Sequence, residues 1–173
     1  MNNISIKKVT SEDIKLLQQI GKQTFHETFA EMNTAEDMNR YLTDRFSLER
    51  LAAELQDENS EFYFANDNNI PIGYLKINKG VAQTEIKDNN AVEIERIYVL
   101  KEYHGKSVGQ QLYNKAIEYA KELDANYIWL GVWEENPRAI NFYEKNGFKE
   151  FGRHIFKLGN DEQTDIMMKL ELK

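Results

Sequence analysis

Two apolar segments separated by a helical pattern constrain the fold of this chain more than any other feature. Residues 91–100 and 127–133 have the composition of β-strands, and between Val108 and Leu123 apolar residues recur with the spacing of a helix. A strand, a crossover helix and a second strand form a right-handed unit in which both strands run parallel. The helix then begins at the carboxyl end of the first strand, an edge where ligands commonly bind.

The apolar residues of the first of these strands change parity along its length. Val92 and Ile94 occupy even positions, whereas Ile97 and Val99 occupy odd positions. A β-bulge near Glu95 would explain the change, because one extra residue moves the following side chains to the opposite face. A strand that is buried on both faces and tolerates charges is an equally good explanation.

Further strands and helices are predicted around this unit. They are a strand at 4–9, a helix capped by Ser11 and ending near Ala30, helix starts at 33–37 and Ser47, a hairpin of strands 61–66 and 72–79, a helix from Pro137 to Asn146–Gly147, and final strands at 148–158 and 163–172. The sequence contains no repeat or low-complexity linker, so we expect one domain spanning residues 1–173.

The composition restricts the possible partners. With 29 acidic and 22 basic residues the formal net charge is −7, which disfavours nucleic acid and favours cations. No apolar run approaches the roughly 18 residues of a membrane-spanning helix, and the first eight residues lack a secretory signal, so we expect a cytoplasmic protein with no membrane partner. No metal site is expected, because cysteine is absent and the three histidines have no ligand spacing; these are His26, His104 and His154.

The segment between the first strand and its helix is typical of a phosphate-binding turn. Gly105 and Gly109 allow a ligand to approach the backbone, and the unpaired amides at a helix start attract anions. A P-loop would require glycine where Leu100 stands, and the chain contains no G-x-G-x-x-G motif. Nucleoside triphosphate and dinucleotide sites are therefore disfavoured, whereas a pyrophosphate site and an ordinary glycine-containing loop both remain possible.

Two polar residues, Asn136 and Tyr143, follow the second strand of this unit. Asn136 precedes a helix that begins with Pro137, and Tyr143 lies seven residues further on, on the same helix face as Asn136. Taken with the strand, turn and helix before it, this pattern over residues 91–150 resembles the GNAT superfamily of acetyl-CoA-dependent N-acetyltransferases. The resemblance implies a single α/β domain in which a mixed, mostly antiparallel sheet has splayed central parallel strands and flanking helices.

The resemblance also implies an acetyl-CoA site. The pyrophosphate turn of the superfamily reads Arg/Gln-x-x-Gly-x-Gly/Ala, and this chain departs from it with His104 and Ser107 at the first and fourth positions. Tyr143 matches the family tyrosine that protonates the departing thiolate, although an isolated tyrosine at such a place would more often be a packing residue. The implied cofactor-binding residues are Ile97, Tyr98, Val99, His104, Gly105, Lys106, Ser107, Val108, Gly109, Asn136, Arg138 and Tyr143.

Acetyl transfer to an amine also needs a proton acceptor. An alkylamine with a pKa near 10.4 is only about one part in a thousand neutral at pH 7, so activity should rise toward alkaline pH. Glu93 and Glu95 lie on the strand beside the expected thioester, where either is placed to accept the proton directly or through water. Family comparison favours Glu93, and the alternative is that both glutamates are solvated or pair with Arg96.

A finer resemblance concerns the acceptor. Residues 24–29, 94–99 and 131–136 resemble the bacterial spermidine/spermine N-acetyltransferases, which implies a polyamine acceptor and a possible homodimer. The implied substrate contacts are Glu27, Glu31 and Tyr41. The alternatives are acetylation of an amino acid, a peptide amine or an aminoglycoside, and a noncatalytic regulator that binds acetyl-CoA.

Overall fold

The computed structural model describes residues 3–173, and its centre is a seven-stranded sheet of order β1-β2-β3-β4-β5-β7-β6. The strands are β1 (Ile4–Lys8), β2 (Ser60–Asp67), β3 (Ile70–Lys79), β4 (Ala91–Val99), β5 (Tyr127–Trp133), β6 (Lys149–Leu158) and β7 (Asp161–Glu171). Within the described residues β4 and β5 form the one parallel pair, and the other neighbouring strands are antiparallel. The predicted mixed, mostly antiparallel sheet is confirmed.

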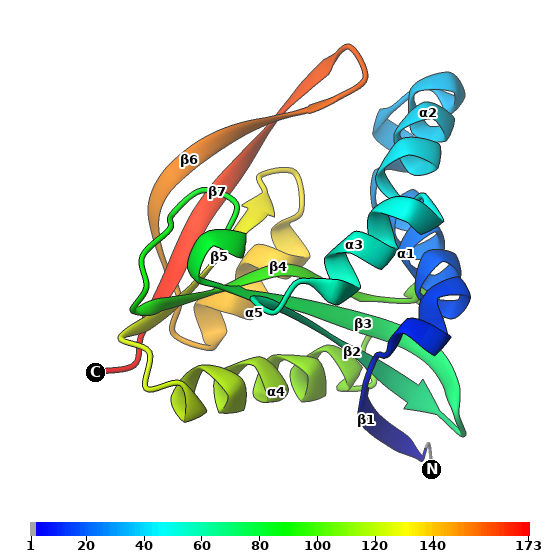
Figure 1. The fold of residues 1–173 in the computed structure, drawn as a ribbon. Helices are drawn as coiled ribbons and strands as arrows, with labels where there is room; N and C mark the ends of the chain where they lie inside the picture. Colours follow the sequence, from blue (N-terminus) through cyan, green and yellow to red (C-terminus); the bar gives the residue numbers. More distant parts are fainter. Residues whose placement is uncertain (1–2) are drawn as a thin grey trace.

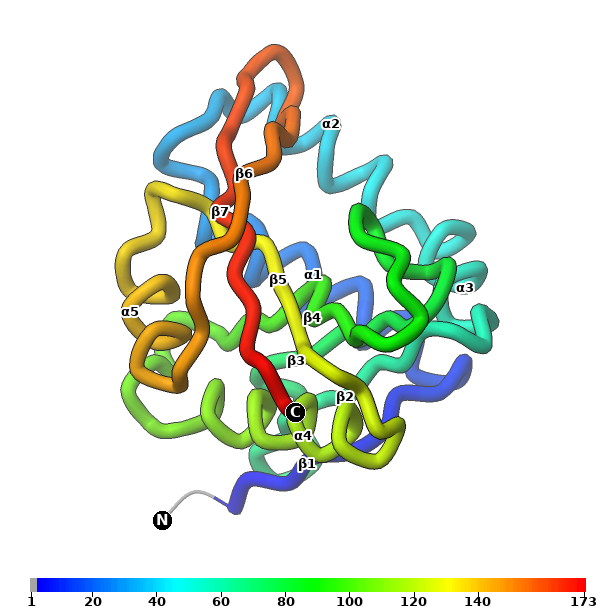
Figure 2. The backbone as a smooth tube through the Cα atoms, turned by 90° about the vertical axis from the view of Figure 1, so that its left-hand side faces the viewer, coloured from blue at the N-terminus to red at the C-terminus, as the bar shows by residue number. Residues whose placement is uncertain are grey.

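Helices cover both faces of this sheet. They are α1 (Ile14–Phe29), α2 (Ala35–Arg45), α3 (Leu48–Gln56), α4 (Val108–Glu122) and α5 (Pro137–Lys145), with short 3-10 turns η1 (Ser11–Asp13), η2 (Ala30–Met32), η3 (Gly80–Ala82) and η4 (Lys101–Tyr103). Figure 1 shows α1, α2 and α3 on one side of the sheet and α4 along the other, and Figure 2 shows α5 beside α4. No helix in residues 3–173 is long and apolar enough to cross a membrane.

The parity change in β4 comes from a bulge. Lys76 of β3 pairs with Arg96, but the next residue, Ile77, pairs with Ile94, so Glu95 is the extra residue. The alternative explanation also holds for the first part of the strand, because Val92, Glu93 and Ile94 are all buried on a strand whose side chains alternate between the two faces. The bulge therefore lies between the part of β4 that is buried on both faces and the part that no longer pairs with β5.

A gap between β4 and β5 opens just after this bulge. The parallel ladder joins Ala91–Ile94 to Tyr127–Leu130 and does not extend further along either strand. Beyond it β4 continues to pair with β3, and β5 continues to pair with β7. The two central strands therefore splay, and the chain leaving β4 turns through η4 into α4 at the mouth of the gap.

Local details differ from the sequence prediction at two turns. Thr10, rather than Ser11, begins the first helical segment, because the backbone amide of Thr10 donates to Oδ2 of Asp13 over 3.0 Å and an η1 turn precedes α1. The β2–β3 turn is shorter than predicted. Asn68 and Asn69 have φ values of 51° and 71°, the left-handed conformation that a two-residue hairpin turn requires and that asparagine tolerates.

Candidate functional site

The gap between β4 and β5 opens into a cavity of about 270 Å³ on the side of α1 and α2. The cavity wall contains the bulge and part of the strand beyond it, residues 129–133 of β5, one face of α5, and the β6–β7 hairpin. The edge of β4 that faces β5 after Ile94 has no strand partner. Unpaired backbone of this kind is able to hydrogen bond an extended ligand as an additional strand does.

The turn from Gly105 to Gly109 presents free backbone amides at the mouth of the gap, whereas the amide of His104 donates to the carbonyl of Lys101 over 3.1 Å. The first α-helical hydrogen bond of α4 runs from the amide of Gln111 to the carbonyl of Ser107, so the preceding amides lack helical partners. A Cβ on Gly105 would meet no atom within 4 Å, which leaves room for a ligand against the backbone. The turn therefore has the geometry of an anion site.

Ser107 explains how this turn forms without glycine at the fourth position of the motif. Its φ is +64° and its ψ is 16°, which is the left-handed conformation that glycine usually supplies. Serine adopts this conformation at a cost of about 1 kcal/mol. The departure from the family pattern thus changes the residue but keeps the backbone path.

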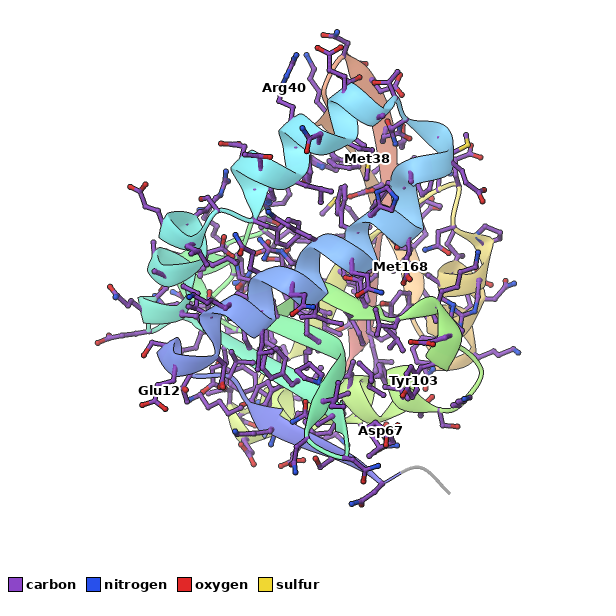
Figure 3. The ribbon with its side chains drawn as sticks, turned by 90° about the vertical axis from the view of Figure 1, so that its right-hand side faces the viewer. Glu12, Met38, Arg40, Asp67, Tyr103 and Met168 are labelled. Atoms are coloured by element: carbon purple, nitrogen blue, oxygen red, sulfur yellow. The ribbon has the colours of Figure 1, made fainter. Side chains whose placement is uncertain are left out.

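Basic side chains surround the turn. His104 places Nε2 2.9 Å from the carbonyl oxygen of Val99, and burial together with the charge of Arg138 lowers the His104 pKa. Lys106 lies over the ring of Tyr103, with Nζ 5.2 Å from the ring centroid. The Tyr103 hydroxyl in turn donates to Asp67 over 2.9 Å at the β2–β3 turn, a contact visible in Figure 3. The turn is thereby anchored to the sheet, and the basic groups of Lys106 and Arg138 lie close to it.

Asn136 and Tyr143 reach the cavity from α5. Oδ1 of Asn136 accepts a hydrogen bond from the amide of Ala139 over 3.2 Å and caps the helix, while its side-chain nitrogen takes no part in that bond. Tyr143 is buried two turns along the helix and lines the cavity. Burial raises the pKa of its hydroxyl, so the hydroxyl keeps its proton at neutral pH.

The two glutamates of β4 have different environments. Glu93 is buried and accepts from the amide of Thr84 at 2.8 Å, from the Thr84 hydroxyl at 2.6 Å, and from Asn78 at 3.0 Å. Burial raises the pKa of Glu93 in spite of these hydrogen bonds. Among residues 3–173 Glu93 forms no ion pair, and the loop after β3 holds it at the cavity wall.

Glu95, the bulged residue, is instead part of an ion-pair network. It lies 2.8 Å from Nζ of Lys76 and 3.1 Å from Nη2 of Arg96, and Arg45 donates to it over 3.2 Å. Burial alone would raise its pKa, but Arg96 and Lys76 lower the pKa to about 2. The pairing with Arg96 that the sequence left open is present, and it leaves Glu95 a weak base.

The remainder of the cavity wall combines aromatic rings with carboxylates. Phe25 stacks on Tyr41 with ring centroids 4.6 Å apart, and Phe29 packs on Trp133 at 4.9 Å. Tyr41 is thus brought to the cavity as expected. Two other residues expected as substrate contacts lie outside its lining: Glu27 accepts from the backbone amide of Lys101 over 3.0 Å, and Glu31 is exposed in η2.

Two carboxylates line the cavity that were not expected from the sequence. Glu85 lies on the loop after η3, where it contacts His154, and Asp165 lies in the middle of β7. The position of Glu85 depends on how its loop folds over the sheet, and nothing local in the sequence indicates it. Asp165 has a signal, because aspartate is uncommon inside a strand and therefore calls for an explanation.

Comparison with known proteins identifies this arrangement. A family model described as the acetyltransferase (GNAT) family matches residues 24–148. The chain belongs to the GNAT acetyltransferase family. This GNAT chain is also 38% identical over 172 residues to an uncharacterized N-acetyltransferase of Lactobacillus delbrueckii subsp. lactis, with 99% of each chain covered.

Two further relatives come from Thermoplasma acidophilum. A spermidine N(1)-acetyltransferase is 27% identical over 151 residues, which cover 85% of this chain and 89% of that protein. The crystal structure of PaiA N-acetyltransferase in complex with coenzyme A has a TM-score of 0.79 at 23% identity, with 98% of this chain and 99% of that chain covered. The GNAT fold predicted from the sequence is confirmed, and the chain is an N-acetyltransferase that uses acetyl-CoA.

The geometry fits this donor. Acetyl-CoA combines an extended pantetheine arm with a pyrophosphate, and the chain offers an unpaired strand edge beside free amides at the start of α4. The space around Gly105 and the basic groups of Lys106 and Arg138 suit the pyrophosphate.

Proposed function

We propose that this enzyme acetylates a primary amine of a small cationic alkylamine, with spermidine or spermine as the leading acceptor. The observation that carries the proposal is the cavity at the β4–β5 gap, where carboxylates and aromatic rings face the same space. Carboxylates suit ammonium groups, and aromatic faces suit both methylene chains and cations. The similarity to a spermidine N(1)-acetyltransferase supports the same acceptor class.

The donor is proposed to lie along the gap with its thioester at the cavity. The proposed contacts are the backbone of Ile97, Tyr98 and Val99 for the pantetheine arm, Asn136 beside it, the turn His104, Gly105, Lys106, Ser107, Val108 and Gly109 for the pyrophosphate, and Arg138 next to that turn. Each of these assignments uses a group whose position favours it: an unpaired strand edge, a helix start or a nearby cation.

The proposed reaction is direct attack of the amine on the thioester. The amine nitrogen bonds to the carbonyl carbon, the carbon–sulfur bond breaks, and the nitrogen gives up a proton. Of the two glutamates on β4, Glu93 suits the role of proton acceptor, because burial raises its pKa, whereas Glu95 is neutralised by Arg96 and Lys76.

Tyr143 is proposed to act on the leaving group. The ordinary pKa of a thiol is near 8.5, and burial keeps the tyrosine hydroxyl protonated well above that pH. The hydroxyl therefore donates a hydrogen bond to the departing thiolate and lowers the barrier to carbon–sulfur cleavage. Coenzyme A leaves as the thiol once it has taken up a proton.

The test is thiol release from acetyl-CoA with spermidine, spermine, lysine, an aminoglycoside and no acceptor in parallel. We expect release that depends on the polyamines and rises toward alkaline pH, because more of the amine is then neutral. Release with lysine or the aminoglycoside alone would replace the acceptor and keep the chemistry. Tight binding of acetyl-CoA without release from any amine would favour a noncatalytic regulator. A homodimer and a cytoplasmic location stay predictions.

A further inference from the structure

Asp165 is a carboxylate at the cavity that the reaction above leaves without a role. It lies in β7, opposite Trp133 of β5 and His154 of β6, and its side chain lines the cavity. Burial raises the pKa of Asp165 to about 6. A desolvated carboxylate in the middle of a strand costs the fold free energy, so packing does not account for it.

Gly131 gives Asp165 an open path to the gap. It is the first residue of β5 beyond the last parallel pair, Ile94 with Leu130, and it is exposed although β5 is an interior strand. A Cβ on Gly131 would lie 3.4 Å from Oδ2 of Asp165. The carboxylate therefore lies beside the point where β4 and β5 separate, which is the proposed place of the thioester.

The groups around Asp165 compensate its charge only in part. His154 faces it across the β6–β7 ladder and acts against burial by lowering its pKa, but the His154 ring contacts Glu85. Tyr98 of β4 lines the same cavity, and its hydroxyl stays protonated because burial and neighbours that include Asp165 raise its pKa. Within residues 3–173 no lysine or arginine forms an ion pair with Asp165, unlike Glu95 with its three cationic neighbours. Asp165 is therefore suited to bind a cation that comes from outside the chain.

We propose that Asp165 binds the ammonium group of the attacking amine at the gap and so determines the affinity of the enzyme for cationic acceptors. This inference rests on the proposed function and deepens it by naming the residue that selects the acceptor. Two N–H groups of an ammonium suit the two oxygens of one carboxylate in short, charge-assisted hydrogen bonds. Because a neighbouring carboxylate also raises the pKa of the amine, Asp165 positions the acceptor, and Glu93 remains the proposed proton acceptor.

The test separates acceptor binding from the other steps. In Asp165→Asn, which keeps the size and removes the charge, the KM for spermidine should rise about tenfold to hundredfold, the effect of losing a hydrogen bond to a charged group. The KM for acetyl-CoA and the kcat at saturating spermidine should stay within about threefold. Asp165→Glu should recover part of the affinity. Asp161→Asn, an exposed aspartate at the start of the same strand, is the matched control and should change none of these values.

A second measurement does not depend on turnover. Titration of spermidine into the enzyme with coenzyme A bound should give a Kd that rises in Asp165→Asn by a factor similar to the KM. An unchanged KM and Kd in a folded Asp165→Asn would overturn the inference, as would equal losses for both substrates. In those cases the unaltered enzyme still acetylates spermidine. If the unaltered enzyme acetylates no cationic amine, the proposed function fails and this inference fails with it.

Discussion

The two sides of the site are built from different parts of the chain. The proposed donor side consists largely of backbone, and it comes from two short stretches, one from the end of β4 to the start of α4 and one from β5 to α5. The proposed acceptor side is the cavity, to which α1, α2, the loop after η3, β4 and the β6–β7 hairpin add side chains beside those of β5 and α5. Its members are as far apart in the sequence as Phe25 and Asp165.

This difference predicts which substitutions each side should tolerate. A donor held by amides and a strand edge depends on backbone conformation, so its side chains can vary when φ and ψ are kept. An acceptor held by carboxylates and rings depends on the side chains themselves. Relatives of one fold are therefore able to share a donor and differ in their acceptors.

The largest effect is expected for Tyr143, whose side chain belongs to the proposed donor side although that side consists mainly of backbone. Tyr143→Phe should lower kcat about tenfold to thousandfold by removing one hydrogen-bond donor to the thiolate, while the Kd for acetyl-CoA stays within about threefold. Steady-state kinetics and calorimetric binding measure the two effects. Tyr113→Phe, at a buried tyrosine of α4 that packs on Phe142, is the control and should retain activity. Full activity in Tyr143→Phe would remove the assigned role.

The next largest effect concerns the bulged residue. Glu95→Gln should lower the free energy of unfolding at pH 7 by about 2 to 3 kcal/mol, because it leaves the buried Lys76 and Arg96 with Glu54 as their remaining counter-charge. The folded pKa of Glu95, about 2, is below its unfolded value of 4.5, so its contribution is fully present above pH 4.5 and is lost as the pH falls toward 2. Urea titrations of both proteins at pH 7 and pH 3 measure this. Equal stability of the two proteins at pH 7 would show that the network is not structural.

Removing the charge of Asp165 should change the free energy of unfolding in the opposite direction from Glu95→Gln. Its folded pKa of about 6 exceeds its unfolded value of 3.8, so the charged form destabilises the fold as the pH rises from about 4 through 6. Asp165→Asn should therefore raise the free energy of unfolding by about 1 to 3 kcal/mol at pH 7 and leave it unchanged at pH 4. The same urea titrations test the prediction. A loss of stability at pH 7 would indicate that Asp165 holds the strand together and is not kept there for a ligand.

The smallest effect is expected at Ser107, because its backbone conformation, and not its side chain, is expected to determine donor binding. Ser107→Gly relieves the left-handed strain but increases the freedom of the unfolded chain by a similar amount, so stability should change by less than about 1 kcal/mol. The KM for acetyl-CoA should stay within about twofold. Ser107→Val is the contrasting variant, because a β-branched residue fits this conformation poorly, and it should raise that KM. A KM raised by glycine as much as by valine would show that the hydroxyl binds the donor, because both variants lack it.

The sequence indicates the backbone features of the proposed donor side more directly than the residues of the cavity wall. The turn 104–109, the helix start at Asn136 and the parity change at Glu95 are local patterns that spacing and turn chemistry make visible, although their roles toward the donor came from the resemblance to the GNAT superfamily. The contacts of Glu27 and of Asp165 depend on how α1 and β7 pack over the sheet. The presence of a carboxylate did not predict which residues line the cavity, since Glu27 accepts from the backbone of η4 while Asp165 lines the cavity.

The short ladder between β4 and β5 has a consequence for the mechanics of the whole sheet. Four residue pairs, Ala91–Ile94 with Tyr127–Leu130, join a four-stranded half-sheet to a three-stranded half-sheet. A donor bound along the gap would hydrogen bond to strands of both halves and extend that junction. Acetyl-CoA would then serve as an extra strand as well as a reactant, and its departure as coenzyme A would loosen the same junction. Amide hydrogen exchange in β4 and β5 should accordingly slow on donor binding and recover after each turnover.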